Sequence, residues 1–224
     1  MCYNVNMIIG ITGLIGSGKD TVADYLCTFH GFKRISFAES LKDAIAVIFN
    51  WDRELLDGVT KVSREWRETV DPWWAERLGI PHLTPRWVLQ QWGTEVARRG
   101  FHDEIWVAAL ENKIRNIKDD IVITDCRFPN ELESIKRAGG ITVRTHRGKE
   151  PDWIELATSY NTNDDPAERI RAKVLLEEQY GVHASEYSSL GFDYDVHLDN
   201  NGTIDGLHEQ IKSLVLNLPD ARAV

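Results

Sequence analysis

The sequence predicts an α/β fold in which a parallel sheet of about five strands is flanked by helices. Short apolar runs rich in β-branched residues alternate with segments whose apolar residues recur at helical spacing, an order typical of parallel sheets. A glycine-rich stretch between the first such strand and the first such helix fits the same architecture. The chain has 224 residues, 42% of them hydrophobic and 27% charged. That size suits one large domain, or one domain with a sizeable insertion.

The five strands are expected at residues 7–12, 34–37, 121–124, 141–145 and 194–198. Helices are expected at 19–29, 41–49 and 129–138, the last with Pro129 at its start and Gly139 just past its end. In the first helix, Val22, Leu26 and Phe29 recur at helical spacing. The closing helix begins after Thr203, a good N-cap, and is expected to bury Ile204, Leu207, Ile211, Leu214 and Val215. The order in which the strands pair does not follow from one sequence.

Two stretches interrupt the alternation of strands and helices. Residues 50–115 are mostly helical in pattern and hold seven of the eight tryptophans, which makes them a candidate homodimer face. Residues 147–190 are polar and include a loop-like run at 159–166. Both stretches have two interpretations at this point, either ligand-binding regions or packing helices and a variable surface insertion.

The spacing of Gly13, Gly18 and Lys19 is that of a phosphate-binding loop, and the loop lies between a predicted strand and a predicted helix, as that motif requires. Glycines let backbone N–H groups converge on phosphate oxygens, the helix N-terminus adds positive potential, and the lysine reaches the β- and γ-phosphates. The candidate ATP-binding residues are Gly13, Gly16, Ser17, Gly18, Lys19, Asp20 and Thr21. The lysine and the strand context disfavour an ordinary glycine-rich turn.

Asp20 stands where a strict phosphate-loop signature has Ser or Thr. Thr21 follows it, so a hydroxyl is available one position later for Mg²⁺ or a phosphate oxygen. Asp20 either helps to hold Mg²⁺ or favours the positive end of the helix, and both interpretations stay open.

A second motif follows the predicted strand at 121–124. Asp125 lies at the carboxyl end of this strand, where ligands bind in open α/β sheets, and Arg127 comes two residues later. The acid is a candidate ligand of a metal ion and the arginine a candidate partner of a phosphate. The alternative is an acid that caps the next helix and a surface arginine.

A further helix opens at Thr84 and Pro85, with an apolar stripe expected at Leu89, Trp92 and Val96. A polar row at four-residue intervals consists of Arg86, Gln90, Thr94 and Arg98. The row is either a solvated face or a surface that reads a nucleotide, with arginines for the phosphate and Gln90 or Gln91 for the base edge. Trp87 or Trp92 would then be available to stack, although tryptophans at such spacing are more often part of a core.

Charge and composition exclude several classes of function. The net charge of −9 argues against general nucleic-acid binding, which needs a basic surface. Cys2, Cys27 and Cys126 form no CxxC pair, so we interpret them as reduced cytosolic thiols. Apolar runs fall far below the ~20 residues of a membrane span. With no secretion signal in the sequence, we expect a cytoplasmic protein that does not bind membranes.

Six stretches together resemble the bacteriophage-type deoxynucleoside monophosphate kinases. They are "GLIGSGKDT", "ISFAESLKDAI", "RWVLQQWGTEVAR", "ITDCRFPNELESI", "GGITVRTHRG" and "DNNGTIDGLHEQI", in this order. The pattern "LQxxGTExxR" followed by "DxRFPNE" is much more selective than the phosphate loop alone. The match covers most of the chain except residues 50–83 and 147–190.

The resemblance implies a single P-loop kinase domain with a core at 1–49, 116–146 and 191–218, an acceptor-binding helical region at 50–115 and a lid at 147–190. It implies Mg²⁺-dependent transfer of the γ-phosphoryl group from ATP to a deoxynucleoside 5′-monophosphate, in the host cytoplasm if the protein is phage-encoded. Lys19, Arg127 and a lid arginine would neutralise charge on the transferred group. Arg147 is the first choice for that lid arginine and Arg144 the second.

The same resemblance places Phe37 and Lys42 where the acceptor pocket begins, with core packing and a solvated lysine as equal alternatives. The acceptor set is Phe37, Lys42, Arg86, Gln90, Gln91, Thr94, Arg98, Asp125 and Arg127, and the Mg²⁺ set is Asp20, Thr21 and Asp125. His183 and Glu186 in "HASE" are expected to lie outside the site.

Two rival functions agree less well with these motifs. A guanine-nucleotide switch would need Asn-Lys-x-Asp and Asp-x-x-Gly, and residues 112–115 and 125–128 lack the acid and the glycine. A P-loop kinase of another small acceptor, such as a coenzyme precursor, keeps the fold, and only "LQQWGTEVAR" and its neighbours speak against it.

Overall fold

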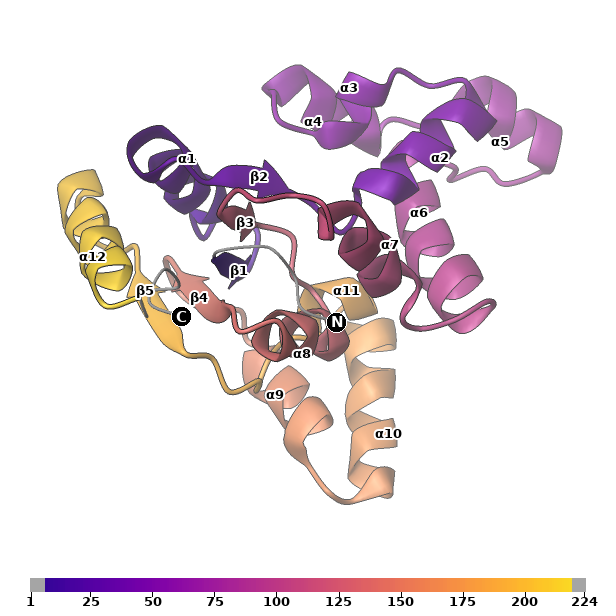
Figure 1. The fold of residues 1–224 in the computed structure, drawn as a ribbon. Helices are drawn as coiled ribbons and strands as arrows, with labels where there is room; N and C mark the ends of the chain where they lie inside the picture. The colour runs from indigo at the N-terminus through magenta and orange to yellow at the C-terminus, as the bar shows by residue number, and fades with distance from the viewer. Residues whose placement is uncertain (1–6, 219–224) are drawn as a thin grey trace. The chain divides into compact units, whose positions relative to one another are not determined.

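The computed structural model describes residues 7–218 (Figure 1). Cys2 lies outside this range. The described chain forms two compact units. The sheet unit consists of the residues up to Ser36 and those from Glu111 onward, and the helical unit of Phe37–Leu110. Among residues 7–218, no helix is both long and apolar enough to cross a membrane.

The sheet unit contains the predicted parallel sheet. Its strands are β1 (Ile8–Thr12), β2 (Lys33–Ile35), β3 (Ile121–Ile123), β4 (Ile141–His146) and β5 (Val196–Asp199). They pair in the order β2-β3-β1-β4-β5, and every pair is parallel. The expected α/β fold with five strands flanked by helices is therefore confirmed. Because the strands are parallel, their carboxyl ends, including those of β1, β3 and β4, meet at one edge of the sheet.

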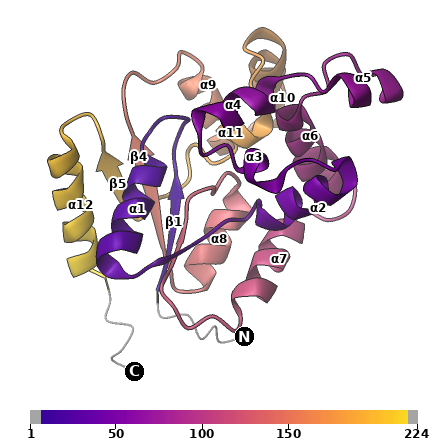
Figure 2. The ribbon, with the colours of Figure 1, turned by 90° about the horizontal axis from the view of Figure 1, so that it is seen from above.

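Helices cover both faces of this sheet. Figure 2 shows α1 (Lys19–His30) and α12 (Ile204–Leu216) on one side of β1 and α8 (Pro129–Arg137) on the other. Buried apolar side chains form a core between the sheet and the helices α1 and α12. Its members include Ile9, Ile11, Val22, Leu26, Val122, Val143, Leu207 and Ile211. Burial of this many branched aliphatic side chains supplies the main driving force for the unit, at roughly 25 cal/mol per Å² of apolar surface.

The N-cap of the closing helix is as predicted, whereas two apolar residues of the predicted helices are exposed. Gly31 ends α1 in the left-handed conformation, and the Thr203 hydroxyl caps α12 by accepting a hydrogen bond from the Gly206 N–H. Phe29, however, is 66% exposed, because the Tyr25 ring occupies the space against α12 and Phe29 packs on that ring from outside. Ile204 is also exposed, since it lies in the first turn of α12.

The polar segment between β4 and β5 folds into helices. They are α9 (Ile154–Thr162), α10 (Pro166–Val174), the π-helix η2 (Leu175–Gln179) and α11 (Ala184–Tyr187). They enclose a small apolar cluster of Ala157, Leu176, Tyr187 and Leu190. The loop expected at 159–166 was wrong: its first half completes α9, and Asp165 at its end caps α10. Polar side chains on half-exposed helices produced the loop-like pattern.

The helical unit contains α2 (Glu39–Phe49), α3 (Arg53–Asp57), α4 (Lys61–Glu68), α5 (Pro72–Leu78), α6 (Pro85–Gln90), the π-helix η1 (Gln91–Arg99) and the start of α7 (Ile105–Ile114). Its buried core is Leu41, Ile45, Phe49, Leu56, Leu83 and Val88. Six tryptophans pack against that core, namely Trp51, Trp66, Trp74, Trp87, Trp92 and Trp106. They are therefore packing residues first, and Trp73, 61% exposed, is the exception.

Candidate active site

The phosphate loop runs from the end of β1 to the start of α1. Gly18 occupies the N-cap of α1 with φ of 101°, and Gly13 has φ of 144°, values that side chains rarely adopt. A Cβ at Gly13 would also collide with the Thr145 carbonyl and lie 2.6 Å from the Ser17 hydroxyl oxygen. The loop is thus folded tightly against β4, with the N-terminus of α1 and its free N–H groups directly beyond it.

Lys19 is held inside this loop. Its ammonium donates hydrogen bonds to the carbonyls of Gly13 at 2.7 Å and Leu14 at 2.9 Å. Burial and the neighbouring Arg127 guanidinium lower the pKa of Lys19 to about 8, against the opposite influence of nearby carboxylates. An anionic phosphate beside the ammonium would favour its charged form, so the site is electrostatically prepared for such a ligand.

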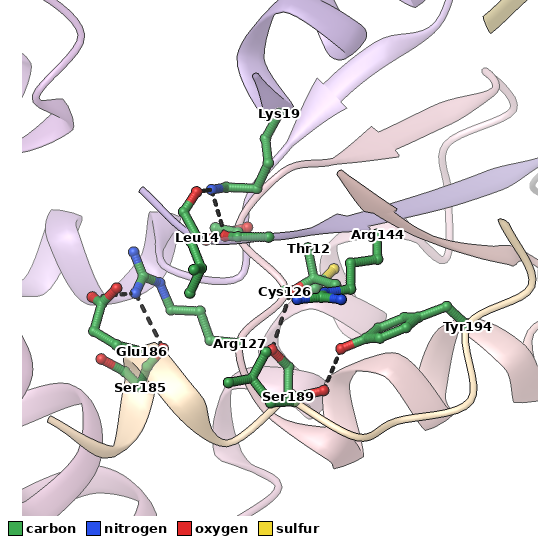
Figure 3. Close-up of a pocket in the computed structure, with 13 residues that line it drawn as sticks. Thr12, Leu14, Lys19, Cys126, Arg127, Arg144, Ser185, Glu186, Ser189 and Tyr194 are labelled. Carbon is green, nitrogen blue, oxygen red and sulfur yellow. Dashed lines mark hydrogen bonds and ion pairs between the residues drawn. The ribbon is translucent and has the colours of Figure 1, made fainter. Parts of the chain in front are cut away.

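A pocket opens at the carboxyl edge of the sheet, within the sheet unit (Figure 3). Its lining comes from β1 and the loop (Thr12, Gly13, Leu14), from α1 (Lys19), from the end of β3 (Asp125, Cys126, Arg127), from β4 (Arg144) and from the segment before β5 (Ser185, Glu186, Ser189, Leu190, Tyr194). The structure thus brings together Lys19, Asp125 and Arg127, which the sequence proposed from two separate motifs.

Arg127 projects into this pocket from the turn after β3. Its guanidinium donates to the Glu186 carboxylate at 2.7 Å and to the Ser185 carbonyl at 3.2 Å, both on α11. Its backbone N–H and that of Phe128 donate to one oxygen of Glu131, which fixes the turn at the start of α8. Arg127 is therefore anchored through its backbone while its side chain bridges to α11.

Asp125 and Arg144 complete the polar lining. The Ser36 hydroxyl, one residue beyond β2, donates a 2.6 Å hydrogen bond to Asp125. Arg144 donates to Glu150 at 2.6 Å and faces the same pocket. Arg147, the lid arginine that the sequence favoured, lies in the exposed turn after β4 and is not part of the pocket lining.

The residues proposed for Mg²⁺ differ in their surroundings. Among residues 7–218, no group of three or more His, Cys, Asp or Glu side chains forms a metal site by itself. Mg²⁺ that binds together with a nucleotide is usually held by one or two carboxylates and by substrate phosphates. Of the residues proposed for it, Asp125 lines the pocket and Thr21 does not. The Asp20 carboxylate is 80% exposed and faces Arg34 at 3.5 Å, so it would have to exchange this partner for a metal.

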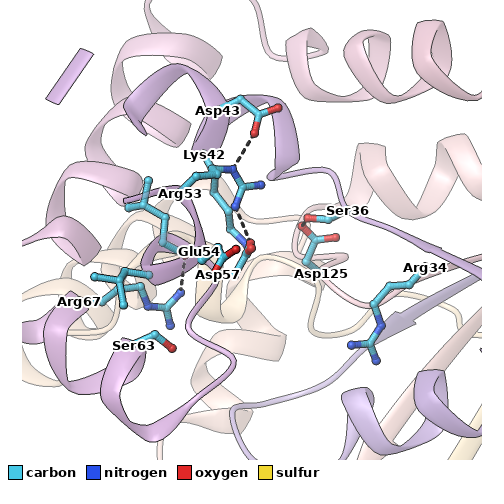
Figure 4. A network of polar contacts seen from close by, with 12 residues as sticks. Arg34, Ser36, Lys42, Asp43, Arg53, Glu54, Asp57, Ser63, Arg67 and Asp125 are labelled. Carbon is cyan, nitrogen blue, oxygen red and sulfur yellow. Dashed lines mark hydrogen bonds and ion pairs between the residues drawn. The ribbon is translucent and has the colours of Figure 1, made fainter. Parts of the chain in front are cut away.

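Two acceptor candidates begin the helical unit. Phe37 is buried, as expected of core packing. Lys42 forms a 2.9 Å ion pair with Asp57, and Arg53 binds the same carboxylate at 2.8 Å (Figure 4). Burial raises the pKa of Asp57, but the hydrogen bonds from Arg53 and Lys42 outweigh it and hold that pKa below its usual range. Lys42 is thus a paired lysine rather than a solvated one.

The polar row on the Thr84 helix begins in α6 and ends in η1. Arg86 forms an ion pair with Glu68 at 3.1 Å, and Gln90 and Gln91 are half-buried. Thr94 and Arg98 are buried, with Arg98 donating to the Asp103 carbonyl at 2.7 Å. The interpretation of the row as a solvated face is therefore wrong for its second half, Thr94 and Arg98. The expected apolar stripe is also wrong at its end, since Val96 is 51% exposed while Val88 is buried.

The change from an α-helix to a π-helix at Gln91 explains this outcome. Hydrogen bonds near the end of η1 span five residues, as between the Gly100 N–H and the Glu95 carbonyl. The rotation per residue then differs from that of an α-helix, so positions that form one face before Gln91 do not continue on it. π-Helices are rare, and the short π-bulges in which they mostly occur are frequently found at functional sites.

Several lining residues were missed by the sequence analysis. Glu186 was expected outside the site and lies in the pocket wall, whereas His183 caps α11 by accepting a hydrogen bond from the Ser185 N–H. Ser189 and Tyr194 had no signal of their own. The only available indication for Glu186 was the short "HASE" motif, which ends at this carboxylate.

Comparison with known proteins adds two relatives of similar length. The chain is 32% identical over 226 aligned positions to a deoxynucleotide monophosphate kinase of Acanthamoeba polyphaga mimivirus, covering 94% of this chain and 97% of the relative. It is 26% identical over 188 positions to the deoxynucleoside-5′-monophosphate kinase of Escherichia phage T5, covering 62% of this chain and 75% of the relative. No protein-family model matches the chain.

Among solved structures, dephospho-CoA kinase from Campylobacter jejuni is similar with a TM-score of 0.44 and 15% identity, covering 96% of this chain and 98% of that one.

Proposed function

Since the chain belongs to the deoxynucleotide monophosphate kinase family, we propose that it transfers the γ-phosphoryl group of ATP to the phosphate of a deoxynucleoside 5′-monophosphate. The observation that carries the proposal is the meeting of Lys19, Asp125 and Arg127 in one pocket beside the phosphate loop. Two cations and a carboxylate at the carboxyl edge of a parallel sheet suit a ligand rich in phosphate.

The pocket residues would act by positioning and by neutralising charge. The backbone N–H groups of the loop and the Lys19 ammonium would hold the β- and γ-phosphates, and Arg127 would meet the transferred group. When bound, Mg²⁺ would neutralise further phosphate charge, with Thr21 and Asp125 as its protein partners. The attacking phosphate oxygen is already an anion, so the transfer needs no dedicated base.

Arg144 is our choice for the additional arginine over the transferred group. Its guanidinium already faces the pocket, whereas Arg147 would have to move with the segment 147–190 to reach it. That segment is the proposed lid, since α11 contributes Glu186 to the pocket and lid closure would exclude water from the reaction.

The helical unit is the proposed acceptor-binding region. Two of its buried polar side chains, Thr94 and Arg98, lie on the π-helix η1, and Arg86 and Gln90 precede them on the same continuous helix. Because ATP and nucleoside monophosphates are cytoplasmic metabolites, we place the protein in the cytoplasm.

A coupled assay of ADP release tests the proposal, with ATP, Mg²⁺ and each ribo- and deoxyribonucleoside monophosphate in turn. We expect ADP release to depend on a deoxynucleoside monophosphate. The matched control is Lys19→Met, which keeps the length of the side chain and removes its charge. This variant should lose nearly all turnover while its melting temperature stays close to that of the parent protein. The proposal would be contradicted if no monophosphate in the panel increased ADP release. Turnover of Lys19→Met within a few-fold of the parent would also contradict it.

A further inference from the structure

We propose that Thr145 is a positioning residue that holds the phosphate loop in its nucleotide-binding shape from the base of the lid. Thr145 lies near the end of β4, two residues before Arg147, and is 1% exposed. It does not line the pocket, so its action would pass through the loop. The expected changes in nucleotide affinity rest on the proposed function. The expected changes in the loop itself rest on its geometry alone.

The Thr145 hydroxyl makes two hydrogen bonds at the root of the loop. It donates to the Thr12 carbonyl at 3.1 Å and lies 2.8 Å from the Ser17 hydroxyl. A carbonyl can only accept, so the one Thr145 proton is used there. The Ser17 hydroxyl must therefore donate to Thr145. The hydrogen bond that Ser17 donates therefore ties the phosphate loop to β4.

Burial makes this pair of hydrogen bonds important for the loop. Thr12 and Ser17 are both 3% exposed, so no solvent is available to replace a lost partner. An unpaired buried hydroxyl is costly, and the loop would shift to satisfy it. Gly13 leaves little room for such a shift, because atoms of Thr145 and Ser17 occupy the space where a Cβ on Gly13 would lie.

The C-terminal end of the proposed lid also contacts Thr12. The Thr12 hydroxyl lies 3.1 Å from the Ser189 hydroxyl, a contact drawn in Figure 3, and the Tyr194 hydroxyl donates to the Ser189 carbonyl. The segment 147–190 thus leaves β4 just after Thr145 and returns at Ser189, and both ends are bonded to Thr12. The residue that begins the phosphate loop is therefore the common anchor of the loop and the lid.

Two substitutions and one matched control test the role of Thr145. Thr145→Val keeps the volume and removes the hydroxyl, and Thr145→Ser restores it. Thr142→Val removes an equally buried hydroxyl from the same strand, where it serves Asp195 and not the loop. We expect Thr145→Val to raise the Kd for ATP about tenfold, measured by calorimetry without acceptor, which equals about 1.4 kcal/mol. Thr145→Ser should return the Kd to near the parent value, and Thr142→Val should leave it unchanged.

Hydrogen exchange of the amides of residues 13–18 gives a second readout that needs no nucleotide. Exchange should quicken in Thr145→Val and stay as in the parent in Thr142→Val, although both variants lose thermal stability. The proposal is overturned if the two Val variants change the loop equally, or if Thr145→Ser behaves like Thr145→Val. Should the parent protein fail to bind ATP, the proposed function fails, and the exchange comparison alone decides the role of Thr145.

Discussion

The hydroxyl of Ser36 donates a 2.6 Å hydrogen bond to the carboxylate of Asp125. The two residues follow neighbouring parallel strands whose register pairs Ile35 with Ile123, so both lie at the carboxyl edge of the sheet. The bond directs one carboxylate oxygen toward β2. The other oxygen is then set in a defined direction in the pocket wall, where we propose that Asp125 serves the metal–nucleotide complex.

Replacing Ser36 should therefore weaken the use of Mg²⁺. A hydrogen bond to a charged group contributes about 1.5–3 kcal/mol, so we expect Ser36→Ala to raise the Mg²⁺ concentration for half-maximal rate by roughly tenfold. Titration of the initial rate with Mg²⁺ at saturating ATP measures this. Ser36→Thr keeps the hydroxyl and is the control. A lower rate with an unchanged Mg²⁺ dependence would show that the bond serves the fold or the acceptor instead.

Arg144 and Arg147 can be separated by their effects on kcat. If Arg144 contacts the transferred group, Arg144→Ala should lower kcat by roughly 10³-fold with little change in the KM of the acceptor, because such a contact strengthens in the transition state. Arg147→Ala, three residues along the chain, should change kcat little. Steady-state kinetics of the two variants measure both effects. The reverse ranking would assign the role to Arg147 and would mean that the lid closes over the pocket.

Much of the fold follows from local sequence, and the failures have physical causes. The strands at β1 and β3 are short apolar runs, and their burial is evident from composition alone. The order of the strands depends on pairing between distant segments, which no local pattern encodes. The π-helix was missed because apolar spacing over nine residues does not distinguish hydrogen bonds that span four residues from those that span five.

The candidate site divides in the same way. Lys19 and Asp125 were found because each belongs to a motif in which strand, turn and residue type agree. Ser36 and Glu186 were not, since each enters the site through a contact with a residue 59 or more positions away. Residue type and local sequence do not separate a serine or glutamate of the site from one that serves the fold or faces solvent. The three-dimensional contact alone identifies it.

Stability should depend on pH through Asp195. Burial raises the pKa of this carboxyl, but hydrogen bonds from the Thr142 hydroxyl and N–H and from Lys136 outweigh it, and the net pKa lies below its usual value. A lowered carboxyl pKa contributes stability that is present above the pKa of the unfolded chain, about 4, and is lost as the pH falls through the folded pKa.

Asp195→Asn should accordingly destabilise the protein by about 1–2 kcal/mol at neutral pH, a modest value because the side chain is partly exposed. The difference from the parent protein should shrink as the pH falls below about 4. Urea unfolding at several pH values measures it. The control is Asp193→Asn, which makes the same charge change two residues earlier. There the Lys136 ammonium donates a hydrogen bond to the backbone carbonyl and not to the carboxylate. A difference that stays constant with pH would mean that ionisation of Asp195 is not involved.

Substitutions in the polar row that begins at Arg86 can distinguish a nucleotide kinase from a kinase of another acceptor. If the row reads a monophosphate, Arg86→Ala should weaken every nucleotide acceptor alike, because the phosphate is common to all of them. Gln90→Leu removes a donor and an acceptor and should instead affect some bases more than others, by roughly 1–3 kcal/mol for each buried hydrogen bond lost. Acceptor KM values across the panel of monophosphates, with ATP binding measured separately, distinguish these patterns.

Arg99→Ala is the matched control, because Arg99 is exposed on the same helix and paired with Glu95. If Arg86→Ala and Gln90→Leu both lose affinity for ATP, or if neither differs from Arg99→Ala, then the row does not contact the acceptor and another surface must bind it.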